Sequence, residues 1–516
     1  MKQAAEVTGE PGSLSIAPMD DHNRALAANV HPPDWANPEP AGRYNLVVVG
    51  AGTAGLVAAA GAAGLGARVA LVERDLMGGD CLNFGCVPSK ALIRTARSYA
   101  EVRDAARFGI EVPPARVDFP FVMERMRRLR AEFSAKDSAA RFKSLGVDVF
   151  IGDGRFTGRD TLEVAGKRLK FARGAITTGA RAGSIPIAGL QDAGYLTNET
   201  VFSLTELPRR LVLIGAGPIG CELAQTFRRF GSEVTLLEAA PQILTREDRD
   251  AAERVERAMV RDGVNLMTSV NIRSVETRNR EKIIHLECGG EPNELAADQI
   301  LIGIGRAPAV DGLGLEAAGV EYDRARGITV NDRLQTSNPR IYAAGDVCSA
   351  YKFTHVSDAM ARIVIRNALF FGRAAASALT IPWCTYTDPE IAHVGLYEAE
   401  ARQRAIEVAT FVQELAGVDR AILDGESDGF VKLHADRKTG RIVGATIVAS
   451  HAGEMISELT MAIAAGVSMS RLADVIHPYP TQAEAIRKTG DAWNRTRLTP
   501  FVSRIFKTLL AIRRRV

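Results

Sequence analysis

Hydrophobic and polar positions divide the N-terminal half of the chain into alternating strand-like and helix-like segments. An apolar run over 46–49 is followed by Gly50, Gly52 and Gly55 and then by an alanine-rich stretch. Valine favours strands and alanine favours helices, so this pattern predicts a buried strand, a tight turn and a buried helix. The segment 44–67 has no charged residue and is long enough to span a membrane, but its glycines favour a strand-to-helix turn instead.

The spacing of these glycines is typical of a dinucleotide-binding turn. Gly50 permits the turn, Gly52 lets the backbone approach a pyrophosphate, and Gly55 allows close packing of helix on strand. A second apolar run over 69–72 ends at Glu73, which lies 21 residues after the middle glycine. An acidic residue at this distance is expected to accept a hydrogen bond from a ribose hydroxyl.

The same pattern recurs later in the chain. Apolar residues 211–214 precede Gly215, Gly217 and Gly220, and the following apolar run ends at Glu238. A carboxylate here binds an unphosphorylated ribose and repels a 2′-phosphate, and no arginine follows before position 246. The sequence therefore predicts an α/β protein that binds two dinucleotides in two Rossmann-like domains, with NADH preferred over NADPH at the second.

Composition narrows the class of protein further. The 516 residues suggest about three domains, and six cysteines exclude a disulfide-stapled scaffold, which favours a cytoplasmic protein. The net charge of +3 gives no reason to expect a nucleic-acid partner. Residues 1–42 are rich in proline and lack the basic and apolar regions of a secretory signal, so we expect an extended arm lying on the body of the protein.

Two cysteines lie five positions apart, directly after the first predicted dinucleotide-binding unit. Cys86 is followed by Pro88, which suits an early helical position, and Lys90 comes one turn after the cysteine. A helix N-terminus and a nearby lysine both favour a thiolate, so Cys81 and Cys86 are predicted to form a redox-active pair rather than two buried apolar side chains. The four other cysteines lack metal-ligand spacing and are interpreted as structural, with no resident metal site.

The segment 78–90, Gly-Gly-Asp-Cys-Leu-Asn-Phe-Gly-Cys-Val-Pro-Ser-Lys, resembles the redox-active disulfide motif of the flavoprotein pyridine nucleotide–disulfide oxidoreductases. Further matches lie at 177–179, 303–308, 342–347 and 388–392, so the resemblance covers about residues 43–490. It implies an FAD-binding domain over 43–190 and 307–377, an NAD(P)-binding domain over 191–306, and an α+β dimerisation domain over 378–490 of a homodimer.

The resemblance also implies the residues that hold the two cofactors. For FAD and the nicotinamide nucleotide together, these are Gly50, Gly52, Gly55, Glu73, Gly79, Lys90, Thr178, Gly179, Gly345, Asp346, Gly215, Gly217, Gly220, Glu238 and Gly305. Asp346 would bind the ribitol of FAD. Electrons would pass from NAD(P)H through the flavin to the Cys81–Cys86 disulfide. Cys86 would face the flavin, Cys81 would meet the substrate, and Lys90 would pair with Glu222 to stabilise the reduced flavin.

The sequence departs from this family where dihydrolipoamide dehydrogenase and glutathione reductase carry a catalytic histidine. Tyr479 occupies that place, Glu484 keeps the place of its acidic partner, and His477 lies two residues early. A phenol is a poor base at neutral pH, and mercuric reductase also carries tyrosine here. Tyr195 resembles another active-site tyrosine of that enzyme. These residues favour a mercuric-reductase-like enzyme acting on a small-molecule acceptor, with soft thiolates suited to Hg(II).

Two alternatives remain beside this interpretation. His477 could replace the missing base in a dihydrolipoamide dehydrogenase, and Tyr479 could have a packing role alone. The absence of a cysteine pair at the C-terminus and of an N-terminal Cys-x-x-Cys domain departs from mercuric reductases.

The last segment, 491–516, is predicted to form a basic amphipathic tail. From Arg487 onward, nine basic residues stand against one acidic residue. Such a helix can lie on an anionic membrane, and this would make the protein a membrane-surface flavoprotein. Packing of its apolar face on the protein itself or on a partner is the favoured interpretation.

Overall fold

The structure is a computed structural model that describes residues 16–514. The chain divides into two compact units, one formed by Met1–Pro241 with Val264–Leu379 and the other by Gln242–Gly263 with Thr380–Val516. Each unit is described by itself.

The first unit contains a seven-stranded sheet built around the first glycine turn. The strand order is β3-β2-β1-β6-β5-β4, and β18 pairs with β6. Strands β3, β2, β1, β6 and β18 pair in parallel, whereas β4 and β5 are antiparallel additions. The strands are β1 Arg43–Val49, β2 Val69–Glu73, β3 Val147–Ile151, β4 Gly154–Gly158, β5 Thr161–Val164, β6 Lys167–Ile176 and β18 Ile341–Ala343. The uncharged segment 44–67 is thus a buried strand and helix, as predicted.

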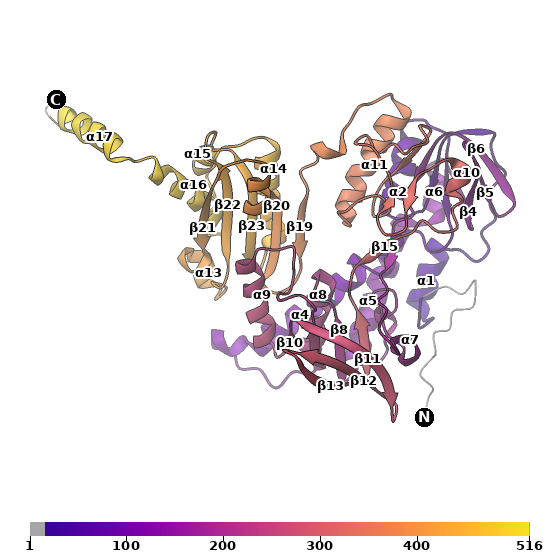
Figure 1. Cartoon of the computed structure of the whole chain (residues 1–516), viewed down its shortest axis with the longest axis horizontal. Helices are drawn as coiled ribbons and strands as arrows, with labels where there is room; N and C mark the ends of the chain where they lie inside the picture. Colours follow the sequence, from indigo (N-terminus) through magenta and orange to yellow (C-terminus); the bar gives the residue numbers. More distant parts are fainter. Residues whose placement is uncertain (1–15, 515–516) are drawn as a thin grey trace. The chain divides into compact units, whose positions relative to one another are not determined.

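Helix α2 (Thr53–Gly64) follows the first glycine turn and lies beside α11 (Thr354–Leu369) next to this sheet (Figure 1). The close approach uses Gly61, where an added Cβ would lie 2.6 Å from the Ile365 side chain of α11. Other helices of this region are α3 Gly79–Asn83, α4 Cys86–Arg103, α5 Phe119–Ser134 and α6 Ala139–Ser144. Helices α4 and α5 pack on each other, and α4 also packs on α8 (Pro218–Phe230).

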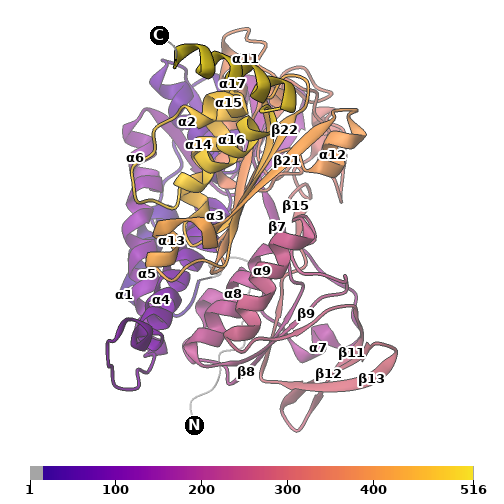
Figure 2. The same cartoon turned by 90° about the vertical axis from the view of Figure 1, so that its left-hand side faces the viewer.

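The second glycine turn belongs to a four-stranded parallel sheet in the order β10-β9-β8-β14. Beside it lies the antiparallel sheet β11-β12-β13 (Figure 2). The elements are β8 Arg210–Ile214, α8 Pro218–Phe230, β9 Glu233–Leu237, β10 Asn265–Met267, β11 Val270–Arg278, β12 Glu281–Cys288, β13 Glu291–Ala297 and β14 Gln299–Ile302. The predicted fold class of two Rossmann-like units is confirmed.

The second unit is an α+β domain built on an antiparallel sheet with strand order β19-β20-β23-β22-β21. Its core is formed by inward-facing residues of the central strands and by α14 and α16. The elements are β19 Pro382–Thr385, β20 Glu390–Gly395, α12 Glu398–Gln403, β21 Val408–Glu414, α13 Asp419–Leu423, β22 Phe430–Asp436, β23 Ile442–Ala449, α14 Ala452–Ala464, α15 Met469–Ala473 and α16 Glu484–Thr496.

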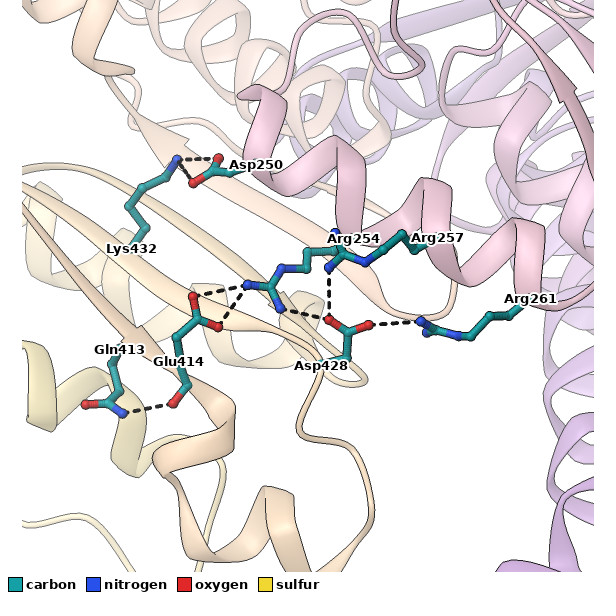
Figure 3. Close-up of polar contacts among 8 residues, drawn as sticks. All are labelled: Asp250, Arg254, Arg257, Arg261, Gln413, Glu414, Asp428 and Lys432. Atoms are coloured by element: carbon teal, nitrogen blue, oxygen red, sulfur yellow. Dashed lines mark hydrogen bonds and ion pairs between the residues drawn. The ribbon is translucent and has the colours of Figure 1, made fainter.

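Helix α9 (Arg249–Arg261) belongs to this second unit, although the sequence places it within the predicted NAD(P)-binding range 191–306. Arg254, Arg257 and Arg261 lie along one side of α9 and pair with Asp428 at 2.8, 3.3 and 3.1 Å (Figure 3). Arg254 also pairs with Glu414 at 3.0 Å, at the end of β21. These ion pairs connect α9 to the β21–β22 side of the sheet.

The expectation of an extended N-terminal arm is wrong for part of its length. Residues Asp21–Val30 form helix α1, whose first turn is capped by the Asp20 carboxylate. Leu26 and Val30 are buried, and Asp20 pairs with Arg127 of α5 at 2.5 Å. Contacts with the rest of the unit thus stabilise a helix that the local composition does not favour. Residues 1–15 of the predicted arm lie outside the described residues.

The basic tail also differs from the prediction. Residues 491–496 are the end of α16, where Trp493 packs edge-on against Phe411 at 5.7 Å. Helix α17 (Pro500–Arg513) follows and has no buried residue, so its apolar face does not pack on its own unit. Within residues 16–514, no helix is both long and apolar enough to cross a membrane.

Candidate active site

The first glycine turn leaves room for a ligand at the start of α2. Gly50 has a φ of +100°, and an added Cβ would lie 2.5 Å from the Thr177 carbonyl oxygen. At Gly55 a Cβ would lie 1.8 Å from the Gly50 carbonyl oxygen, so both positions require glycine. A Cβ added at Gly52 would have no neighbour closer than 3.8 Å, and Gly52 offers no capping side chain to the first turn of the helix. A helix start of this kind fits the pyrophosphate of FAD.

Glu73 lies at the end of β2 beside the same turn. Its carboxylate accepts hydrogen bonds from the backbone N–H groups of Ala51 at 2.6 Å and Asp75 at 2.9 Å. Burial raises the pKa of Glu73, while these two hydrogen bonds favour the ionised form. The carboxylate is therefore held next to the turn, where the sequence predicts a ribose contact.

The other residues predicted to hold FAD surround this turn in the first unit. Gly79 has a φ of +58°, and a Cβ there would lie 2.6 Å from the Gly52 Cα. Thr178 donates a hydrogen bond to the Ala309 carbonyl at 2.7 Å, and Gly179 follows with a φ of +71°. Gly345, after β18, has a φ of +82°. Gly79 thus packs directly on the turn.

Arg306 connects two carboxylates of this region. Its Nη1 lies 2.9 Å from Asp80, directly before Cys81, and 3.4 Å from Asp346. Asn198 donates a further hydrogen bond to Asp80 at 2.9 Å. Burial raises the pKa of Asp346, and Arg306 opposes this effect. The start of α3, which carries Cys81, is thus linked by charge to the residue predicted to bind the ribitol.

The two cysteines of the predicted redox pair are both free thiols in this structure. Helix α4 begins at Cys86, as predicted, and Thr354 lies 3.4 Å from its Sγ. A hydrogen bond from Cys81, opposed by desolvation and assisted by the Lys90 ammonium, lowers the pKa of Cys86 to about 6. The same interaction raises the pKa of Cys81. The pair therefore consists of one thiolate and one thiol at neutral pH.

Lys90 and Glu222 form the predicted ion pair, with 2.8 Å between Nζ and Oε2. Lys90 lies one turn into α4, and Glu222 lies in α8, two residues after Gly220. The Glu222 side chain is 6% exposed, so the Lys90 ammonium is held against a nearly buried carboxylate.

The second glycine turn repeats the geometry of the first. Gly215 has a φ of +100° and lies against Gly303. A Cβ added at Gly220 would lie 1.9 Å from the Gly215 carbonyl oxygen, whereas a Cβ added at Gly217 would meet open space. Glu238 accepts hydrogen bonds from the N–H groups of Ala216 at 2.7 Å and Ala240 at 2.9 Å.

Two further predicted residues belong to the same half of the first unit. Gly305 has a φ of +111° and lies in the loop after β14. Tyr195 is half-buried and packs against the apolar cluster of the β11–β12–β14 region.

The C-terminal residues predicted to act on the thiols all lie in the second unit. They do not form the expected pair between Glu484 and a base at Tyr479 or His477. Tyr479 is 70% exposed and donates a hydrogen bond to Asp419, which raises the pKa of the phenol. Glu484 pairs with Arg487 at 2.9 Å. His477 instead contacts Glu458 at 3.0 Å, through Nε2. A histidine–carboxylate pair therefore exists here, with a different acid from the one predicted.

Sequence reasoning missed Arg306, Asn198, Thr354 and Glu458 as residues near the site. Arg306 lies inside the matching segment 303–308, and this was the available signal. Asn198 and Glu458 are brought to their partners by folding alone, from 118 and 19 residues away. Two of the remaining cysteines fit the structural interpretation, since burial raises the pKa of Cys221 and raises that of Cys348 to about 12.

Two nucleotide-type glycine turns, a hydrogen-bonded dithiol and a separate α+β unit define an oxidoreductase that couples a dinucleotide to thiol chemistry. A family model described as pyridine nucleotide-disulphide oxidoreductase matches residues 44–361, and the model of the dimerisation domain of these enzymes matches residues 381–489. The chain belongs to the pyridine nucleotide-disulphide oxidoreductase family and is an enzyme of this class. FAD is the cofactor expected for this family, and the dimerisation domain indicates a homodimer.

Several relatives are similar over nearly the whole chain. A mercuric reductase of Streptomyces lividans is 35% identical over 451 residues, which cover 86% of this chain and 95% of that protein. A dihydrolipoyl dehydrogenase of Thermus scotoductus is 34% identical over 456 residues, covering 87% and 97%. The HOCl-induced flavoprotein disulfide reductase RclA of Escherichia coli has a similar structure, with a TM-score of 0.78 and 29% identity over 87% of this chain and 99% of RclA.

Proposed function

We propose that this enzyme passes electrons from NADH through FAD to the Cys81–Cys86 pair and on to a small soft acceptor such as thiol-bound Hg(II). The observation that carries this proposal is the thiolate–thiol pair at the start of α4 in a chain that has Tyr479 where a thiol-exchange enzyme of the family needs a base. The substrate-side base is dispensable for a metal ion, because thiolates bind soft metals directly.

We assign FAD to residues 43–190 and 307–377 and the nicotinamide nucleotide to 191–306 without α9. When bound, FAD supplies a two-electron carrier between the nicotinamide and the thiols. The start of α2 would hold its pyrophosphate, Asp346 would accept a hydrogen bond from its ribitol, and the Lys90–Glu222 pair would supply a cation that stabilises its reduced form. At the second turn, Glu238 favours NADH because a 2′-phosphate would meet its carboxylate.

Both thiols take part when the acceptor is a metal ion. Cys86 is already ionised at neutral pH, and Cys81 loses its proton as its sulfur binds the metal. Overall, a Hg(II) ion bound by two thiolates, one NADH and one proton give elemental mercury, NAD⁺ and two free thiols. The proton comes from solvent.

Tyr479 supports the metal acceptor in preference to a disulfide. Its hydroxyl donates to Asp419, and the resulting rise in pKa leaves even less phenolate at neutral pH to accept a proton. Among the relatives, the names mercuric reductase and, for RclA, a Cu(II) complex agree with a metal-ion acceptor.

A dihydrolipoamide dehydrogenase activity is the second candidate, and one contact favours it. His477 is held by Glu458 at 3.0 Å and by the Val475 carbonyl at 3.1 Å, as a base with a fixed orientation would be. In this case His477 would move the proton of the interchange thiol.

The experiment measures NADH oxidation by the flavin-loaded enzyme with each of two acceptors. One is a Hg(II)–thiol complex and the other is lipoamide, the oxidised form of dihydrolipoamide. We expect mercury-dependent turnover that is lost in Cys81→Ser and Cys86→Ser and retained within about threefold in His477→Gln. The matched control Cys288→Ser alters a half-buried cysteine outside the pair and should keep full activity. Lipoamide turnover that collapses in His477→Gln, with no turnover of mercury, would overturn the proposal in favour of the second candidate.

A further inference from the structure

Helix α17 is the one helix of ten or more residues in the described chain that has no buried residue. It begins at Pro500 with Thr499 as its cap and extends from the second unit after a short connection to α16 (Figure 1). Its exposed side chains include Phe501 at 71% and Leu510 at 60%. Exposed apolar groups of this size on an ordered helix indicate a surface that binds a partner.

The residues of α17 separate into two faces at 100° per residue. The apolar face carries Phe501, Val502, Ile505, Phe506, Leu509, Leu510 and Ile512. The opposite face carries Ser503, Arg504, Lys507, Thr508 and Ala511, and Arg514 follows as the C-cap residue. Only Arg513 interrupts the apolar arc, at the last turn, where a long side chain can turn its charge outward. A helix with this division lies flat at a boundary between an apolar and an aqueous phase.

The charge of the residues after Asp491 indicates the kind of surface on which α17 lies. No acidic residue follows Asp491, whereas seven basic residues follow it. A second copy of α17 would carry the same charge and would be repelled, and the helix does not pack on its own unit. An anionic surface with an apolar interior satisfies both faces at once.

We infer that α17 docks on an anionic lipid bilayer, with its apolar face among the acyl chains and its basic face among the headgroups. At 1.5 Å per residue the 14-residue helix is about 21 Å long, which is too short to span a hydrocarbon core of about 30 Å. It therefore lies in the plane of the membrane. This inference does not depend on the identity of the electron acceptor, so it can fail while the proposed function holds.

The test is sedimentation of the full-length, flavin-loaded enzyme with sucrose-filled vesicles of phosphatidylcholine alone or with one third phosphatidylglycerol. We expect binding to the anionic vesicles that weakens with added salt, and at least tenfold weaker binding to the neutral ones. Replacing Arg504 and Lys507 by glutamine should weaken binding about 30-fold, because each basic residue near an anionic surface contributes a factor of about five. The double variant Phe506→Ser with Leu509→Ser should abolish binding with every charge intact.

Two control variants match these changes at other exposed positions of the second unit. Arg402→Gln removes a basic residue from α12, and Leu423→Ser removes an apolar side chain that is 68% exposed at the end of α13. Both should bind vesicles as the unaltered enzyme does. The inference is overturned if the enzyme binds neither vesicle, if a chain ending at Thr496 binds equally well, or if the α17 variants alter the oligomeric state rather than vesicle binding.

Discussion

Cys86 is the residue whose chemistry depends most on its neighbours. Its pKa of about 6 results from the hydrogen bond of Cys81 and from the Lys90 charge, against the effect of desolvation. Alkylation of the reduced enzyme by iodoacetamide should therefore increase as pH rises through about 6, because only the thiolate reacts. Replacing Lys90 by methionine removes a cation that favours the thiolate, so the midpoint should rise by about one pH unit.

Lys90→Arg is the matched control for this measurement, since it keeps the positive charge beside Glu222. Its midpoint should stay within a few tenths of a unit of that of the unaltered enzyme. An unchanged midpoint in Lys90→Met would mean that the Cys81 hydrogen bond alone lowers the pKa of Cys86. Mass spectrometry identifies the alkylated cysteine.

Glu238 decides the choice of nicotinamide nucleotide in our proposal. In Glu238→Ala the carboxylate that would bind the ribose hydroxyls is lost, so kcat/KM for NADH should fall by about 10- to 100-fold, while that for NADPH should fall less or rise. Steady-state kinetics with both nucleotides measure the ratio. The control Glu73→Ala removes the equivalent carboxylate at the first glycine turn. In flavin-loaded enzyme it should leave the ratio of kcat/KM for NADH to kcat/KM for NADPH unchanged. A ratio that is also unchanged in Glu238→Ala would contradict the assignment.

Residues in fixed sequence motifs could be predicted, whereas partners brought together by folding could not. Gly50, Gly55 and Glu73 have local roles that their spacing encodes, and each lies where that spacing predicts. The link from Arg306 to Asp80 and Asp346 joins three segments far apart in the chain, so no local pattern indicates it. Glu484 was predicted to face a proton-transferring group but pairs with Arg487 one turn on in its own helix.

At the scale of elements, α9 shows how charge can assign a helix to a domain. The Asp428 carboxylate pairs with three arginines of α9. Partial burial raises the pKa of Asp428, but the hydrogen bonds from Arg254 and Arg261 lower this pKa below its ordinary value. In Asp428→Asn the free energy of unfolding of the second unit should fall by about 1 kcal/mol at pH 7, a small value because the carboxylate is partly exposed. Urea denaturation followed by tryptophan fluorescence measures it.

The pH dependence of this difference has a definite sign. A carboxylate whose pKa is lowered by folding stabilises the protein above its unfolded pKa of 3.8, and this contribution is lost as pH falls through the lower folded value. The unaltered and Asp428→Asn enzymes should therefore differ at pH 7 and converge below pH 3.8. Asp311→Asn is a suitable control, since its partner Arg324 lies in a single exposed pair of the first unit. A constant difference at all pH values would assign the effect to packing.

Local pattern predicted the sheet elements well and the attachment of helices poorly. The apolar runs at 46–49 and 211–214 are strands because glycine turns and β-branched residues leave few other conformations. Helix α1 forms in a proline-rich arm because its apolar residues are buried against the first unit, and α9 joins the second unit through ion pairs. Both outcomes depend on surfaces that exist only after folding.

For the whole molecule, the enzyme has two separable surfaces in our proposals, a dimer interface in residues 378–490 and a membrane-binding helix beyond α16. A chain ending at Thr496 keeps Trp493 and all of α16, so it should remain a dimer of twice the mass of its own chain and oxidise NADH at an unchanged rate. Light scattering during gel filtration measures the mass, and the full-length enzyme provides the reference. Dissociation of the shortened enzyme into monomers would show that α17 packs on the partner subunit. The apolar face of the helix would then be covered within the dimer and not available to lipid.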